Sequence, residues 1–155
     1  MTTRKSRASL VMRPFARSLP MQLLRAREAL MQEFRPHLRK HGVTEQQWRV
    51  LRALAEVGAS EINSLAEACQ ILPASLSRML PAMQKQGHIV RRLNKKDQRS
   101  TIISITSKGT TLFQRVVRES EQIYSSIERR IGSRELMILY DLLERTILVT
   151  ANTKR

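Results

Sequence analysis

Two short segments carry side chains that could recognise a nucleic acid. The first contains Ala74, Ser75, Ser77 and Arg78, which join a small residue, two hydroxyl groups and one guanidinium. Small residues let a backbone approach a base edge, and an arginine can bind guanine O6 and N7 through two parallel hydrogen bonds. The same residues also fit an ordinary solvent-exposed helix face, so the segments that follow must decide between the two interpretations.

The second segment is a polar, basic stretch between two short β-type runs, Ile89–Leu93 and Thr101–Ile105. This pattern predicts a hairpin with a long tip. We assign DNA contacts to four side chains of the tip, Lys95, Lys96, Gln98 and Arg99. Arg99 is expected in the minor groove, where a narrow width concentrates negative potential. Phosphate would repel Asp97, so we predict that Asp97 positions Arg99 or a neighbouring arginine.

The charge of the whole chain points to the same partner. Its 155 residues include 28 Lys and Arg against 13 Asp and Glu, a formal net charge of +15. Such an excess attracts a polyanion, most often a nucleic acid. Lys85 and Lys108 are candidates for phosphate contacts, which add salt-sensitive affinity but little sequence choice.

Other functional classes find no support in the sequence. We find no Ser-His-Asp arrangement, no metal-ligand spacing, and only five glycines with no phosphate-binding loop, so we expect no enzyme activity, cofactor or metal. The single cysteine, Cys69, excludes an internal disulfide and fits a reducing cytosol. No apolar run has the length of a membrane span. We therefore expect a cytoplasmic, nucleoid-associated protein.

Apolar residues at helical spacing predict two helices before the first segment. One starts near Ser18 and ends by Gly42, and Pro36 inside it predicts a kink or a local break. Thr44 and Gln47 form a capping-box pattern that starts the next helix.

Two further helices are predicted before the hairpin. Asn63 is expected to cap a short helix, and a second helix is expected from about residue 74 to 86. Pro81 lies inside that second helix and predicts a kink after Arg78. A short helix, a turn, a second helix and a basic hairpin together predict a winged helix-turn-helix, in which the start of the second helix meets base edges.

Two more helices are expected after the hairpin. Thr106 is predicted to cap a long helix that Gly132 ends, and a last helix follows. The first helix and these two lie outside the central unit, and their apolar faces need a partner. A second copy of the chain is the simplest partner, so we predict a homodimer.

The chain resembles the MarR family of bacterial transcription regulators. The motifs that carry the likeness are SLAEACQILPASLSRML, then GHIVRR, then DQRSTIISITSKG. The last is similar to the family pattern Asp-x-Arg, a strand, then Leu-Thr-x-x-Gly, with Ile105 in place of Leu. The resemblance implies a mainly α winged helix-turn-helix fold and a homodimer, with residues 1–18 as a basic arm, 19–42 and 106–152 as the dimerisation region and 43–105 as the DNA-binding lobe.

The stretch LLRAREALMQEFRPHLRKHGVTEQQWRVLRAL resembles a narrower group, the repressors of homoprotocatechuate and related aromatic-acid degradation. This likeness implies a small aromatic carboxylate as effector. An arginine would suit its carboxylate, and aromatic or Met side chains would suit its ring. The candidate effector residues are Gln22, Arg27, Met31, Phe34, Trp48 and Arg49. Phe34 and Trp48 are equally consistent with a place in the hydrophobic core, and Arg27 with an ion pair between subunits.

The preferred hypothesis is a repressor that binds a pseudo-palindromic operator in double-stranded DNA. The alternative is an architectural protein that coats DNA without sequence preference, since a charge of +15 would suffice for that. Competition with random DNA separates the two.

Overall fold

The computed structural model describes residues 12–95, 97 and 100–151. In chain order the elements are η1 (Phe15–Arg17), α1 (Leu19–Lys40), α2 (Glu45–Val57), β1 (Ser60–Glu61), α3 (Ile62–Cys69), α4 (Pro73–Lys85), β2 (Ile89–Leu93), β3 (Thr101–Ile105), α5 (Ser107–Ile131) and α6 (Ser133–Ala151). The chain divides into two compact units, Met1–Glu33 and Phe34–Arg155.

The first unit holds η1 and the first part of α1. Its described apolar side chains include Leu19, Leu23, Leu24 and Leu30, and all four are exposed. The helix α1 continues into the second unit and runs through Pro36, so a local break there is wrong, and the kink stays a prediction. A helix that passes a proline loses one backbone hydrogen bond but need not end.

The core of the second unit lies between α2, α3, α4 and the sheet. Leu51 and Leu54 of α2, Leu76 and Leu80 of α4 and Ile103 of β3 are at most 1% exposed. These residues recur at helical spacing on α2 and α4, which leaves the opposite faces to solvent. Burial of this apolar surface holds the second helix of the motif in place against the sheet.

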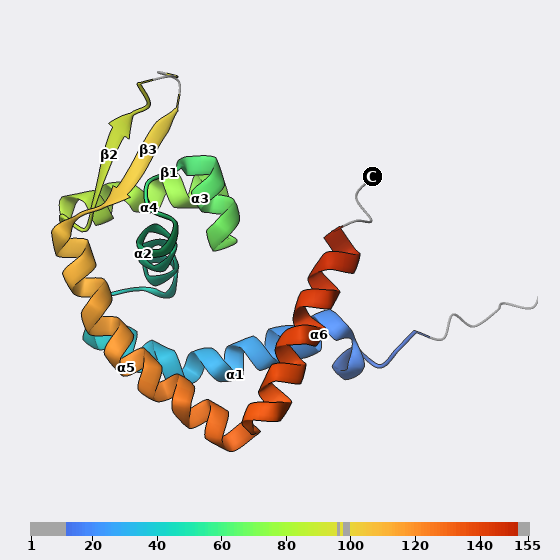
Figure 1. Cartoon of the computed structure of the whole chain (residues 1–155). Coiled ribbons are helices and arrows are strands. Elements are labelled where there is room, and N and C mark those ends of the chain that lie inside the picture. The colour runs from blue at the N-terminus through green and yellow to red at the C-terminus, as the bar shows by residue number, and fades with distance from the viewer. Residues whose placement is uncertain (1–11, 96, 98–99, 152–155) are drawn as a thin grey trace, which may run out of the picture. The chain divides into compact units, whose positions relative to one another are not determined.

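A three-stranded antiparallel sheet carries the hairpin, in the order β1-β3-β2. The hairpin strands have the predicted bounds and pair from Ile89 with Ile105 to Leu93 with Thr101. The strands β2 and β3 project beyond α3 and α4 (Figure 1). The sequence did not predict β1, whose two residues Ser60 and Glu61 pair with Ile103 and Ile102.

The helix starts match the sequence predictions at two of three caps. Thr44 and Gln47 form the capping box, and the Thr106 side chain accepts from the Gly109 amide. Asn63 is not a cap, and that prediction is wrong. The strand pairing keeps the backbone extended as far as Glu61, so α3 begins at Ile62 and Asn63 lies inside it.

The long helix α5 starts beside the sheet, packs on α2, and ends at Gly132, where the chain turns into α6 (Figure 1). Gly132 has a φ of 100°, a conformation that glycine adopts readily. No residue of α6 is buried. Among the described helices, none combines the length and hydropathy that a membrane crossing requires.

Candidate nucleic-acid interface

An arginine of α2 fixes the turn between α3 and α4. Arg49 Nη1 donates to the carbonyl oxygen of Cys69 at 2.6 Å and to that of Gln70 at 3.3 Å. Both carbonyls belong to the end of α3, where a cation also interacts well with the helix dipole. Gln70 takes the left-handed conformation with a φ of 50°, which turns the chain toward α4. Arg49 thereby orients the second helix of the motif.

The start of α4 presents the predicted recognition residues to solvent. Ala74, Ser77 and Arg78 are exposed and Ser75 is half-buried, whereas Leu76 is fully buried. This division follows from helical periodicity, because Leu76 and Leu80 share the face that meets the core. The helix passes Pro81 without a break and ends at Lys85.

The hairpin tip is only partly described. Lys95 and Asp97 are exposed, whereas the predicted contacts Lys96, Gln98 and Arg99 lie outside the described residues. The positioning role of Asp97 therefore stays a prediction. Its carbonyl oxygen accepts from the Ser100 amide at 3.0 Å, which turns the chain back toward β3.

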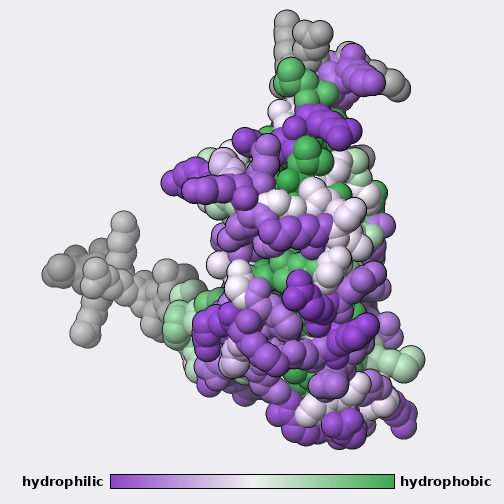
Figure 2. Space-filling view, turned by 90° about the vertical axis from the view of Figure 1, so that its left-hand side faces the viewer, coloured by the Kyte–Doolittle hydropathy of each residue, from purple (hydrophilic) through white to green (hydrophobic). Residues whose placement is uncertain are grey.

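A hydrogen bond joins the hairpin to α4. Arg91 Nε, on β2, donates to Gln84 Oε1 at 2.6 Å. Arg91 and Arg92 are both exposed, and with Arg78, Lys85 and Lys95 they add positive charge to α4 and the hairpin. Figure 2 shows that hydrophilic side chains cover most of the face on the side of β2 and α5. Arg91 and Arg92 belong to the sequence motif GHIVRR, but no role for them is predicted from the sequence.

The start of α5 is tied to the start of β2. Thr106 Oγ1 donates to the Gly87 carbonyl at 2.6 Å and accepts from the Gly109 amide at 3.0 Å. The Thr106 amide donates to the His88 carbonyl at 3.1 Å. Lys108 and Lys85, the predicted phosphate contacts, are both exposed.

Comparisons with known proteins identify the family to which this chain belongs. The model of the MarR family matches residues 43–101. The chain is 39% identical to the HTH-type transcriptional regulator FarR of Neisseria gonorrhoeae, over 81% of this chain and 86% of that protein. It is also 39% identical to the homoprotocatechuate degradative operon repressor of Escherichia coli, over 84% and 88%. The chain belongs to the MarR family. The predicted function, a DNA-binding transcription regulator, is confirmed.

A solved structure agrees with this assignment. The crystal structure of NadR in complex with 4-hydroxyphenylacetate superposes with a TM-score of 0.77 at 35% identity, over 88% of this chain and 97% of that one. The winged helix-turn-helix fold predicted from the sequence is confirmed. We call α4 the recognition helix and the β2–β3 hairpin with its tip, residues 89–105, the wing, and the DNA contacts assigned to both stay predictions.

The predicted effector residues of this MarR-family chain are divided between the two units. Phe34 packs on Tyr124 with ring centroids 4.8 Å apart, and Trp48 stacks on Phe113 at 5.4 Å. Both are buried, and Arg49 is bonded to the end of α3. The other three candidates lie on α1 in the first unit: Gln22, Arg27 and Met31. Gln22 donates to the Ala16 carbonyl, and Arg27 pairs with Glu28 at 2.6 Å.

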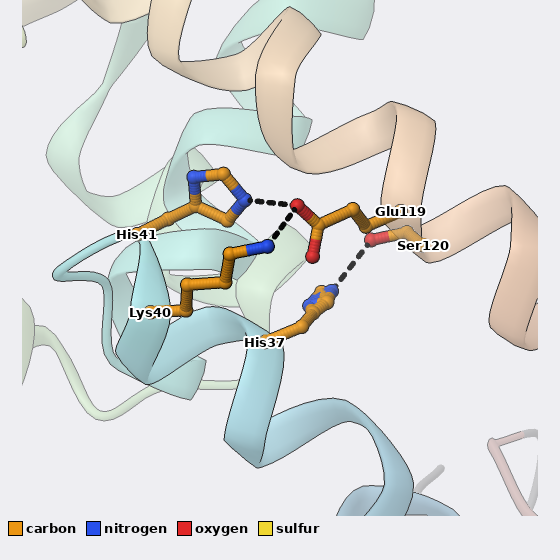
Figure 3. Close-up of polar contacts among 5 residues, drawn as sticks. All are labelled: His37, Lys40, His41, Glu119 and Ser120. Carbon is orange, nitrogen blue, oxygen red and sulfur yellow. Dashed lines mark hydrogen bonds and ion pairs between the residues drawn. The ribbon is translucent and has the colours of Figure 1, made fainter.

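A polar cluster that the sequence did not predict links α1 to α5 (Figure 3). His37 Nε2 lies 3.0 Å from Ser120 Oγ, and both residues are buried. Next to them, Glu119 Oε1 accepts from Lys40 at 3.0 Å and contacts His41 Nε2 at 3.1 Å. The hydrogen bonds from Lys40 and His41 lower the pKa of Glu119.

Burial lowers the pKa of His37 below its usual value of 6.5, against the opposing effect of Glu119 and with help from His41 and Lys40. Within the described residues, Nδ1 of His37 has no hydrogen-bond partner. Among the same residues, no group of three His, Cys, Asp or Glu side chains could hold a metal ion.

We expect acid to destabilise the fold through this histidine. Because the folded-state pKa is lowered, the unfolded chain binds the proton more readily, and stability is lost as the pH falls below about 6.5. Each pH unit below that value costs up to about 1.4 kcal/mol until the folded pKa is reached. His88 also has a pKa lowered by burial and then by Lys108, so it adds a loss of the same sign.

Thermal melts at about pH 7.5 and 5.5 check this prediction. The wild type should lose more stability between the two than the His37→Gln variant, which keeps a polar partner for Ser120. Glu119 titrates below this window, since its pKa is lowered from 4.5. An equal loss in both proteins would show that His37 is not the group responsible.

Proposed function

We propose that this MarR-family chain represses transcription as a homodimer that binds a pseudo-palindromic DNA site and releases it when a small aromatic carboxylate binds. It acts in the bacterial cytoplasm, by binding and not by catalysis. The observation that carries the proposal is the exposed start of α4 with Arg78, beside a wing with the exposed cations Arg91, Arg92 and Lys95, on a core that fixes both.

The dimer is supported by apolar surface that the single chain leaves uncovered. Large exposed side chains of α6 include Met137, Leu142, Ile147 and Leu148, each at least 55% exposed. A second copy is the partner that two-fold DNA sites favour, because it places two recognition helices one helical turn apart, about 10 bp between half-site centres. We accordingly assign residues 19–42 and 106–152 to dimerisation and 43–105 to DNA binding.

The aromatic effector is supported by the relatives and by one cluster of the second unit. One relative is named a homoprotocatechuate degradative operon repressor, and NadR was crystallised with 4-hydroxyphenylacetate. In this chain, Arg52 of α2 is exposed, and its Nη1 lies 3.1 Å from the Tyr124 hydroxyl. The Tyr124 ring packs on Phe34. An exposed guanidinium beside two rings suits an aromatic acid better than Arg49, which already bonds the end of α3.

The test starts with duplexes that the full-length protein selects from a random-sequence pool. Fluorescence anisotropy then measures binding at about 150 mM salt with excess random competitor. A specific regulator should prefer its site by at least about a thousandfold. Binding that vanishes under competitor would contradict the proposal and favour an architectural DNA-coating protein. Release by 4-hydroxyphenylacetate, but not by an aliphatic acid, would support the effector class.

We expect Arg52→Ala to bind the selected duplex normally but to respond weakly to 4-hydroxyphenylacetate. Loss of a charge-assisted hydrogen bond should raise the acid concentration for half-release by about tenfold to a hundredfold. Arg39→Ala is the control, because it removes an exposed cation from α1. Titration of the preformed complex gives the half-release concentrations. An unchanged value for Arg52→Ala would exclude this arginine as the carboxylate partner.

A further inference from the structure

The side chain of Glu61 contacts both ends of the wing tip. Its Oε1 accepts from Asn94 Nδ2 at 2.9 Å and from Ser100 Oγ at 3.0 Å. Asn94 follows the last residue of β2, and Ser100 precedes the first residue of β3. One carboxylate oxygen therefore bonds to the two residues at the ends of the tip.

The backbone of Glu61 has a different task from its side chain. Glu61 pairs with Ile102 in the β1–β3 ladder and stands at the N-cap position of α3. Its side chain makes no capping hydrogen bond to α3. The backbone of Glu61 thus joins α3, the first helix of the helix-turn-helix, to the sheet. Its carboxylate instead bonds to the two ends of the wing tip.

The backbone makes further hydrogen bonds at the tip. The Asn94 amide donates to the Ser100 carbonyl at 3.0 Å, and the Ser100 amide donates to the Asp97 carbonyl at 3.0 Å. The Ser100 hydroxyl also lies 3.2 Å from the Asp97 carbonyl, so its single proton has two acceptors within reach. These backbone bonds close the tip upon itself but do not relate it to α3. The carboxylate of Glu61 does so, because Glu61 stands at the N-cap of α3 and contacts Asn94 and Ser100.

We propose that Glu61 is a positioning residue for DNA recognition, which fixes the base of the wing relative to the helix-turn-helix. The inference rests on the proposed function, since it assumes that α4 and the wing bind one DNA site together. A fixed base lets the cations of the tip meet the groove without first losing conformational freedom. An acidic side chain beside DNA would otherwise weaken binding, because it repels phosphate.

Removal of Glu61 therefore has two opposite effects on DNA affinity: loss of the positioning contacts weakens binding, and loss of the negative charge strengthens it. If Glu61 were only a surface charge, Glu61→Ala would bind every duplex somewhat more tightly. If Glu61 is a positioning residue, the Glu61→Ala variant should instead bind the selected duplex about fivefold to tenfold more weakly than the wild type. Glu61→Gln keeps an acceptor oxygen for Asn94 and Ser100 and should bind at least as well as the wild type.

The matched control is Glu67→Ala. Glu67 is an exposed carboxylate on α3, the helix that Glu61 precedes, and its backbone carbonyl, not its side chain, accepts from Gln70. This variant has the same net charge as Glu61→Ala and should keep or slightly improve affinity. Dissociation constants would be measured for all four proteins on the selected duplex and on a random duplex. Affinity of Glu61→Ala equal to that of Glu67→Ala, or weakness shared by Glu61→Gln, would overturn the proposal.

Hydrogen exchange in the free protein separates this inference from the proposed function. The amides of Asn94 and Ser100 should exchange faster in Glu61→Ala than in Glu67→Ala, at unchanged melting temperature. A wild type without preference for any duplex would reject the proposed function, yet faster exchange would still show that Glu61 holds the tip. Unchanged exchange would overturn the positioning role even if the wild type is a specific regulator.

Discussion

The substitution Gly109→Ala should destabilise the DNA-binding lobe. We expect it to cost more stability than alanine at any other glycine of the chain. An added Cβ would collide with the His88 carbonyl oxygen and lie 2.8 Å from Ile105 Cγ1. Neither neighbour can withdraw easily, because the His88 carbonyl already accepts from Thr106 and Ile105 pairs with Ile89. We expect a loss of about 3 kcal/mol, which lowers the melting temperature by about 10 °C.

Gly58→Ala separates crowding from backbone strain. Gly58 has a φ of 79° but no heavy atom within 4 Å of an added Cβ, so its substitution introduces strain alone. That variant should lose about 1 to 2 kcal/mol. Thermal melts followed by circular dichroism compare the two. A smaller loss for Gly109→Ala than for Gly58→Ala would mean that β2 and α5 can move apart. The tight approach also gives a physical reason for the glycine of the SKG motif.

Loss of the Arg78 guanidinium should remove sequence preference while leaving most of the non-specific affinity. In the free protein, Arg78 is exposed and its Nε lies 3.3 Å from the Ala74 carbonyl of the same helix. The two terminal amino groups take no part in that bond and have the geometry that guanine O6 and N7 require. Arg78→Ala should weaken binding to the selected duplex by about fivefold to 150-fold, because each bidentate contact contributes about 1–3 kcal/mol.

Lys85→Ala is the comparison for Arg78→Ala. Lys85 is exposed in the last turn of the same helix and is a predicted phosphate contact. The Lys85→Ala substitution should weaken binding to selected and random duplexes alike. It should also reduce the slope of log K against log salt concentration by about one. Anisotropy titrations on both duplexes at several salt concentrations distinguish these patterns. An equal loss on both duplexes for Arg78→Ala would assign this arginine to the phosphate backbone.

Local signals in the sequence were enough for most of the architecture. Thr44 with Gln47 and Thr106 with Gly109 act over three residues, and both caps form as predicted. The alternation and composition of residues 89–93 and 101–105 predicted both hairpin strands. These features depend on neighbours in the chain, so one sequence is sufficient to find them.

The features that the sequence did not predict depend on residues far apart in the chain. The strand β1 has only two residues, and it forms because β3 offers a partner about forty positions later. This pairing displaced the expected cap from Asn63 to Glu61. Periodicity likewise placed both Arg49 and Arg52 on α2 but could not tell that the first would bond α3 and the second would meet Tyr124.

Because the apolar face of α6 is exposed in the single chain, the stability of this protein should depend on association with a second chain. In the proposed homodimer, the apolar side chains of α6 are buried only when two chains associate, so folding and association are coupled by mass action. The melting temperature should then rise with protein concentration, and dilution should favour dissociation. The same equilibrium would make occupancy of a two-fold operator depend more steeply than linearly on the number of chains in the cell. Copy number would thus set the threshold of repression as directly as the affinity of any one side chain for DNA.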